Sequence, residues 1–145
     1  IEKPIIASVH GYVIGSGVEI YLLCDIRISA SDASFSMPEI SLGFLPAAAG
    51  TQTLPKFIGL NNTLDLILTR KVLSAKDALS IGLVDRVVDV ENLESESLTL
   101  AKNIKNMNQH LIRAAKKSVS ISDDVPLEKG ILLEKRVFQR FQSRI

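Results

Sequence analysis

The stretch PIIASVHGYVIGSGVEIYLLCDIRISA, residues 4–30, contains two apolar runs with glycines between them. The first run, residues 4–9, is short and β-branched, which predicts a buried strand of a sheet covered on both faces. Gly15 and Gly17 lead into a longer apolar run, which favours a buried helix that begins near Ser16. Residues 25–30 then alternate with the period of a strand that has one solvated side. Strand, helix and strand in this order predict an α/β fold.

The next part of the chain continues this alternation. A short strand is expected at residues 33–36, and Pro38 ends it because proline has no N–H for a sheet ladder. An irregular connection follows, and then helices at residues 47–58, 61–68 and 75–81. The expected helix breaks and caps are Pro55, which would end or kink the first helix, Asn61 or Asn62 at the start of the second, and Ser74 and Gly82 around the third. A β-branched strand at residues 83–90 is the last one predicted.

The remainder of the chain is predicted to be helical, with helices near residues 94–106, 109–120 and 126–142. Apolar residues of the last helix share one face, which needs a partner to pack on: Leu127, Ile131, Leu132, Val137, Phe138 and Phe141. We therefore expect an α/β core over residues 1–90 and a helical subdomain over residues 91–145.

Charge and composition exclude several classes of function. The 145 residues include 17 basic and 16 acidic side chains, a net charge of +1, so no overall field favours nucleic acid or an anionic membrane. A small-molecule substrate fits better. No apolar run approaches the roughly 18 residues that cross a bilayer, and no signal peptide is visible, so we expect a soluble protein. The one cysteine, Cys24, suits a reducing compartment.

The first residue, Ile1, leads directly into a strand-like segment, and we expect the natural start of the protein to be missing. Basic residues gather in the helical part and are interpreted mainly as solvated, with phosphate binding as the alternative: Lys102, Lys105, Arg113, Lys116, Lys117, Lys135, Arg136, Arg140 and Arg144.

A Gly-x-Gly segment that opens a helix presents unpaired backbone N–H groups at the positive end of the helix dipole. Gly15-Ser16-Gly17 is therefore suited to holding a developing oxyanion. Ile20 stands where a dinucleotide-binding fingerprint needs its further glycine, which disfavours that class. There is no Walker lysine, and His10 has no partner at metal-ligand spacing. No metal site is predicted.

Two glutamates interrupt apolar surroundings. Glu19 follows Gly17 by two residues, and Glu39 follows Pro38 at the end of a predicted strand. Burying a carboxylate costs free energy, so two of them in such surroundings indicate acid–base chemistry. A surface position or a capping role for either residue is the structural alternative.

Several segments, in this order and spacing, resemble the crotonase superfamily, which contains the enoyl-CoA hydratase/isomerase family. The segments are KPIIASVHGY (3–12), GSGVE (15–19), CDIR (24–27), FSMPE (35–39), LG (42–43), Pro46, GTQ (50–52), LP (54–55), LSAKDA (73–78) and GLV (82–84). The resemblance implies a crotonase-like spiral of ββα units followed by a helical oligomerisation subdomain, with this chain truncated at both ends.

The resemblance also implies roles for individual residues. In this family the thioester oxygen of an acyl-CoA is held by two backbone N–H groups, and the position of one of them corresponds to Ser16; the other lies in an amino-terminal half that this chain lacks. Glu19 and Glu39 match the pair that holds one water and adds it, as base and acid, across the double bond of a 2-enoyl-CoA. The implied substrate-binding positions are Gly15, Gly17, Pro38, Leu42, Gly43, Pro46 and Ala47.

Two alternatives to hydration stay open: an isomerase that moves the double bond with one acid at Glu39, and a non-catalytic crotonase-like assembly subunit. Dienoyl isomerases carry an aspartate at the position of Ala47 and often at that of Glu19, so that subfamily is disfavoured. Ser16 and Ala49 stand where many members have glycine, and their side chains would narrow the acyl pocket.

Coenzyme A is expected only as part of the substrate, with no other cofactor. The resemblance further implies a homotrimer or homohexamer in a mitochondrion, a peroxisome or the bacterial cytoplasm. The fragment alone is expected to be weakly active or inactive.

Overall fold

A computed structural model describes residues 1–142; Arg144, one of the basic residues named above, lies outside the described part. The chain divides into two compact units. One comprises residues 5–101, and the other comprises residues 1–4 together with residues 102 onward.

Two small sheets form the framework of the unit of residues 5–101. The strands β1 (Ile6–Val9), β3 (Ile26–Ala30) and β6 (Arg86–Val88) make a parallel sheet in the order β1-β3-β6. The strands β2 (Tyr12–Ile14), β4 (Ser34–Ser36) and β5 (Leu73–Ser74) make the other, in which β4 and β5 are antiparallel. Ile6 pairs with Ile26 and Tyr12 with Ser34, so the pair β3-β4 lies parallel to the pair β1-β2.

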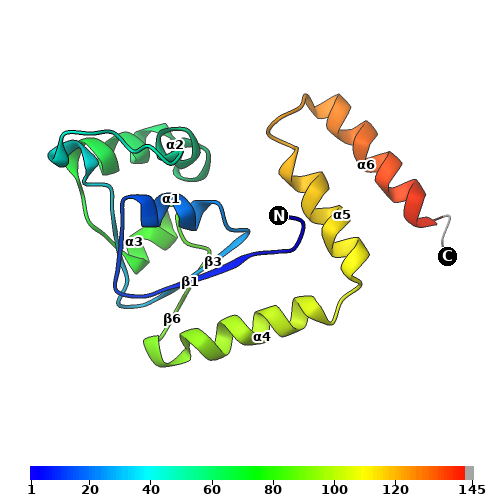
Figure 1. Cartoon of the computed structure of the whole chain (residues 1–145), viewed down its shortest axis with the longest axis horizontal. Helices are drawn as coiled ribbons and strands as arrows, with labels where there is room; N and C mark the ends of the chain where they lie inside the picture. The colour runs from blue at the N-terminus through cyan, green and yellow to red at the C-terminus, as the bar shows by residue number, and fades with distance from the viewer. Residues whose placement is uncertain (143–145) are drawn as a thin grey trace. The chain divides into compact units, whose positions relative to one another are not determined.

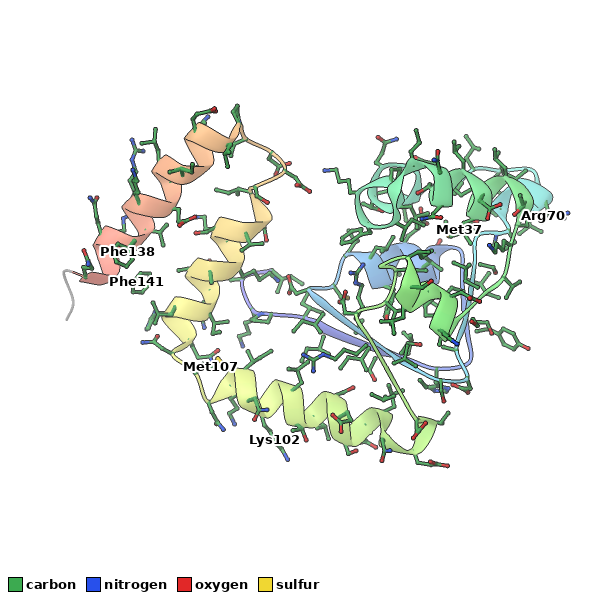
Figure 2. The ribbon with its side chains drawn as sticks, turned by 180° about the vertical axis from the view of Figure 1, so that it is seen from behind. Met37, Arg70, Lys102, Met107, Phe138 and Phe141 are labelled. Atoms are coloured by element: carbon green, nitrogen blue, oxygen red, sulfur yellow. The ribbon has the colours of Figure 1, made fainter. Side chains whose placement is uncertain are left out.

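The helix α1 (Ser16–Leu22) makes the crossover between these two pairs of strands, which gives one turn of a ββα winding. The prediction of an α/β class is confirmed. Figure 1 shows α1 in the space between α2 (Gly50–Thr69) and β1, and α3 (Ala75–Ser80) close to it. The fully buried core side chains include Val18, Leu22, Phe35, Met37 (labelled in Figure 2), Leu54, Leu66 and Leu83.

The helix predicted at residues 47–58 begins later, and the predicted break at Pro55 was wrong. Ala49 has φ 80, a left-handed conformation that ends the preceding loop, so α2 starts at Gly50. Pro55 lies inside this helix, and the kink is at Gly59 (φ 78, ψ 161), because glycine takes such a conformation without a Cβ clash. Asn62 is not a cap; its side chain donates to the carbonyl of Ile58 at 2.8 Å.

The cap predicted at Ser74 is confirmed. Its hydroxyl accepts from the N–H of Asp77 at 3.1 Å, and the Asp77 carboxylate binds the Ser74 N–H in return. The Ser74 hydroxyl also donates to Oδ2 of Asp77 at 2.6 Å, and this hydrogen bond, together with the one from the Ser74 backbone N–H, lowers the pKa of the Asp77 carboxyl.

The strand β3 differs from its prediction, because both of its faces are covered. Ile28, Ser29 and Ala30 are buried, and so is Arg27 at 7% exposure. The Arg27 guanidinium donates to Asp85 through Nη2 at 2.7 Å and through Nε at 3.2 Å, and it stacks on the ring of Phe57. The alternating polar residues of this strand are thus partnered inside the protein, and the alternation does not mark a solvated side.

Asp85 is therefore predicted to be a strong determinant of stability. Its carboxylate also accepts from the backbone N–H of Arg27 at 2.8 Å, so Asp85→Ala leaves a buried guanidinium without its counter-ion. We expect the free energy of unfolding of the full-length protein, measured by denaturant titration, to fall by about 3 kcal/mol. Asp65→Ala is the control, because the 3.3 Å pair of Asp65 with Lys71 is exposed and contributes about 0.5 kcal/mol. Equal losses in the two variants would contradict this interpretation.

The helices predicted in the last third of the chain are confirmed. After the short 3₁₀ helix η2 (Val90–Asn92), α4 is Leu93–Lys105, α5 is Gln109–Ser120 and α6 is Leu127–Gln142. The helices α5 and α6 pack together over an apolar groove whose lining includes Leu111, Val119, and Phe138 and Phe141, which Figure 2 labels. No helix within residues 1–142 is long and apolar enough to cross a membrane.

Candidate active site

The amino-terminal end of α1 is built around Gly15. This residue has φ 55 and ψ −119, a conformation that side-chain-bearing residues rarely adopt, and its N–H donates to the carbonyl of Ser36 at the end of β4. Ser16 and Gly17 follow as the first two residues of the helix and are exposed. Their amides have no partner within the helix and lie at its positive end.

Glu19 lies in the first turn of α1 and is 1% exposed. Its Oε1 accepts from the N–H of Gly50 at 2.7 Å and from the N–H of Ala48 at 3.0 Å. The left-handed conformation of Ala49 turns these two amides toward the same oxygen. The other oxygen, Oε2, is buried and has no hydrogen-bond partner within the described residues.

Glu39 opens the short 3₁₀ helix η1 (Glu39–Leu42) and is 5% exposed. Its carboxylate lies against Gly15, since a Cβ built on Gly15 would stand 2.6 Å from Oε1 of Glu39. Its Oε2 is likewise buried and, among residues 1–142, without a hydrogen-bond partner.

Both buried carboxylates thus lie at the same end of α1. Glu39 touches the residue that caps the helix, and Glu19 is one turn, about 5–6 Å, farther along the axis. Buried polar oxygens are normally hydrogen-bonded, so two unpaired ones beside open amides indicate a place for a small polar molecule. Such a pair can accept a proton and donate one.

The other predicted site residues surround this end of the helix to different extents. Pro38, half-buried, precedes Glu39, and Pro46 is buried in the loop that leads to α2. Leu42, at the end of η1, is exposed, and so are Gly43 and Ala47 in the loop that follows. The structure therefore brings Gly15 into contact with one of the two carboxylates, and the substrate-binding roles of the remaining positions stay predictions.

No role was predicted from the sequence for the backbone amides of Ala48 and Gly50. Gly50 stood in a matching segment, but a backbone N–H has no side-chain signature that would reveal its partner. Burial raises the pKa of the Tyr21 hydroxyl, on the same helix, above its ordinary value. No cluster of His, Cys, Asp and Glu within the described part of the chain could hold a metal ion.

The family model described as enoyl-CoA hydratase/isomerase matches residues 1–145. The chain belongs to the enoyl-CoA hydratase/isomerase family. It is 42% identical over 138 residues to a probable mitochondrial enoyl-CoA hydratase of Dictyostelium discoideum, covering 95% of this chain and 50% of that protein. It is 41% identical to a probable enoyl-CoA hydratase of Mycobacterium leprae, covering 95% of this chain and 54% of that protein.

Solved structures of this family agree with the fold. A Geobacillus kaustophilus enoyl-CoA hydratase subunit superposes with a TM-score of 0.94 at 36% identity, covering 99% of this chain and 56% of that one. The Bacillus anthracis enoyl-CoA hydratase gives a TM-score of 0.91 at 37% identity, covering 95% of this chain and 54% of that one. The predicted crotonase fold is confirmed, and the chain spans about half the length of the curated relatives that it matches.

Proposed function

We propose that the full-length protein adds water across the double bond of a 2-enoyl-CoA thioester. One observation carries this proposal: two buried carboxylates, Glu19 and Glu39, lie at the amino-terminal end of α1, and each has one oxygen without a partner in the described residues. Several relatives 36–42% identical to this chain are named as hydratases, which supports the proposal.

The chemistry follows from the charges that the reaction develops. A water molecule between the two side chains gives a proton to one carboxylate while its oxygen bonds to C3 of the enoyl group. The electrons of the double bond move onto the thioester oxygen, where the N–H of Ser16 stabilises the negative charge. The other glutamate, protonated, then delivers a proton to C2. Water is consumed and a 3-hydroxyacyl-CoA is the product.

Backbone N–H groups suit this task because they are fixed before the reaction begins and need no reorganisation as charge develops. The exposed start of α1 leaves Ser16 accessible to a substrate, whereas the carboxylates behind it are shielded from bulk water. Coenzyme A is part of the substrate, and the reaction needs no other cofactor.

We also propose a homotrimeric or homohexameric assembly, supported by exposed apolar residues of α6 such as Leu127 and Phe138.

The compartment is proposed from relatives alone. Their names include mitochondrial enzymes and enzymes of bacteria, which supports a mitochondrion or the bacterial cytoplasm as the setting.

The direct test is turnover by the full-length protein. Incubated with crotonyl-CoA, it is expected to consume the enoyl thioester and form 3-hydroxybutyryl-CoA, identified by mass from the addition of one water. Conversion of a 3-enoyl-CoA to a 2-enoyl-CoA without hydration would assign the isomerase reaction instead. CoA binding without either reaction would favour the non-catalytic assembly subunit.

A further inference from the structure

Two glycines contact the two buried carboxylates, one glycine for each. A Cβ built on Gly50 would stand 2.6 Å from Oε1 of Glu19, 3.0 Å from its Cγ and 3.1 Å from its Cδ. A Cβ built on Gly15 would stand 2.6 Å from Oε1 of Glu39. Such separations are well inside van der Waals contact, so a side chain at either position displaces a carboxylate.

The contacts cross between the two segments that carry the acids. Gly15 caps the helix that contains Glu19, yet it touches Glu39. Gly50 lies beyond the loop that begins at Glu39, yet it touches Glu19 and donates its N–H to it. The Glu39 carboxylate therefore contacts the segment that carries Glu19, and the Glu19 carboxylate contacts the segment that follows Glu39.

Conformational freedom does not explain Gly50. The described glycines with positive φ are Gly11, Gly15, Gly43, Gly59 and Gly82, and Gly50 is not among them. At Gly11, Gly43 and Gly59 a Cβ would meet nothing within 4 Å, so backbone conformation alone accounts for those three. At Gly50 the backbone tolerates any residue and the neighbouring carboxylate does not.

We propose that Gly50 and Gly15 are positioning residues that set the separation of the Glu19 and Glu39 carboxylates. This inference rests on the hydratase function proposed above. Gly50 acts on Glu19 in two ways: its missing side chain makes room for the carboxylate, and its N–H holds Oε1 at 2.7 Å. The second oxygen of Glu19 is then left in a fixed place.

The test uses Gly50→Ala in the full-length protein, with crotonyl-CoA as the substrate. We expect kcat to fall by about 10²-fold, as a displacement of about 1 Å in a reacting group does, and KM to change far less. Gly130→Ala in α6 is the matched control, because its Cβ would make only an ordinary 3.8 Å contact with Val125. Near-ultraviolet circular dichroism checks that each variant is folded.

A rescue separates a positional effect from a general structural one. Glu19→Asp shortens the acid by one methylene and frees the space that a methyl group at position 50 would need. The loss of kcat in the double variant Gly50→Ala/Glu19→Asp is therefore expected to be smaller than the product of the two single losses. Multiplicative losses, or a change in KM alone, would overturn the proposal. If Gly50→Ala alone does not fold, the double variant Gly50→Ala/Glu19→Asp is expected to fold, because the shorter acid leaves room for the methyl group, and its failure to fold overturns the proposal.

Failure of the proposed function can be told apart from failure of this inference. If the wild-type protein hydrates no enoyl-CoA, the hydratase proposal fails, and a crystal structure of Gly50→Ala still tests the position of Glu19. Displacement of its carboxylate from the N–H of Ala48 supports the inference. A carboxylate that stays in place contradicts it.

Discussion

Glu19→Gln and Glu39→Gln in the full-length protein are each expected to lower kcat for hydration of crotonyl-CoA by about 10²–10⁴-fold. Glutamine keeps the size of the side chain and its capacity to accept a hydrogen bond, but it neither takes up nor delivers a proton. The amides of Ala48 and Gly50 can still bind the Oε1 of a glutamine at position 19, so its placement should survive. Steady-state kinetics with KM determined separately measures the effect.

The control for these variants is Glu128→Gln, an exposed residue in the first turn of α6, which should leave kcat unchanged. Because the two acids act on one water, the double variant is expected to lose little more than the more damaging single one. If either variant hydrated crotonyl-CoA with the kcat of the wild type, the two glutamates would not act together on one water. Loss of hydration only in Glu39→Gln would mean that Glu39 supplies the acid–base chemistry without Glu19.

Ser16→Pro is predicted to lower kcat by about 10²–10³-fold, the usual effect of removing one oxyanion donor. Proline deletes the N–H at this position and fits the first residue of a helix, where its fixed φ is already suitable. Gly15, with ψ −119, is outside the α conformation that a following proline disfavours. The helix should therefore persist while the donor is lost.

Ser16→Ala is the matched control, because it removes the hydroxyl and keeps the amide. We expect its kcat to stay close to that of the wild type. Equal damage in Ser16→Ala and Ser16→Pro would assign the effect to the side chain and would contradict the role of the amide. Circular dichroism and melting temperature confirm that both variants are folded.

The parts of the fold with a strong local pattern could be predicted from the sequence. The apolar run after Gly17 gave α1, and the Ser74–Asp77 capping box gave the start of α3. The apolar residues around Glu19 and Glu39 suggested burial and left a surface position as the alternative; both side chains are buried. The strands Tyr12–Ile14 and Leu73–Ser74 were not predicted, since three and two residues are too few to show a period.

Other features depend on contacts between distant segments. The alternation of apolar and polar residues in this strand predicted a solvated Arg27. Arg27 is buried because its guanidinium is paired with Asp85, which lies 58 residues away in the sequence. The three alanines at 47–49 favour a helix, and a helix was predicted there. The structure has a loop instead, because Ala49 takes a left-handed backbone conformation that alanine disfavours and that its residue type therefore does not predict. That loop and the first residue of α2 supply the two amides that hold Glu19, through Ala48 and Gly50, and neither residue indicates this on its own.

A crystal structure of the full-length protein with a bound, unreactive acyl-CoA tests the shared-water geometry most directly. We predict one water within about 3.2 Å of both Glu19 Oε2 and the Glu39 carboxylate, and the thioester oxygen within the same distance of the Ser16 nitrogen. Carboxylates that point away from each other, or a thioester oxygen held far from the start of α1, would contradict it.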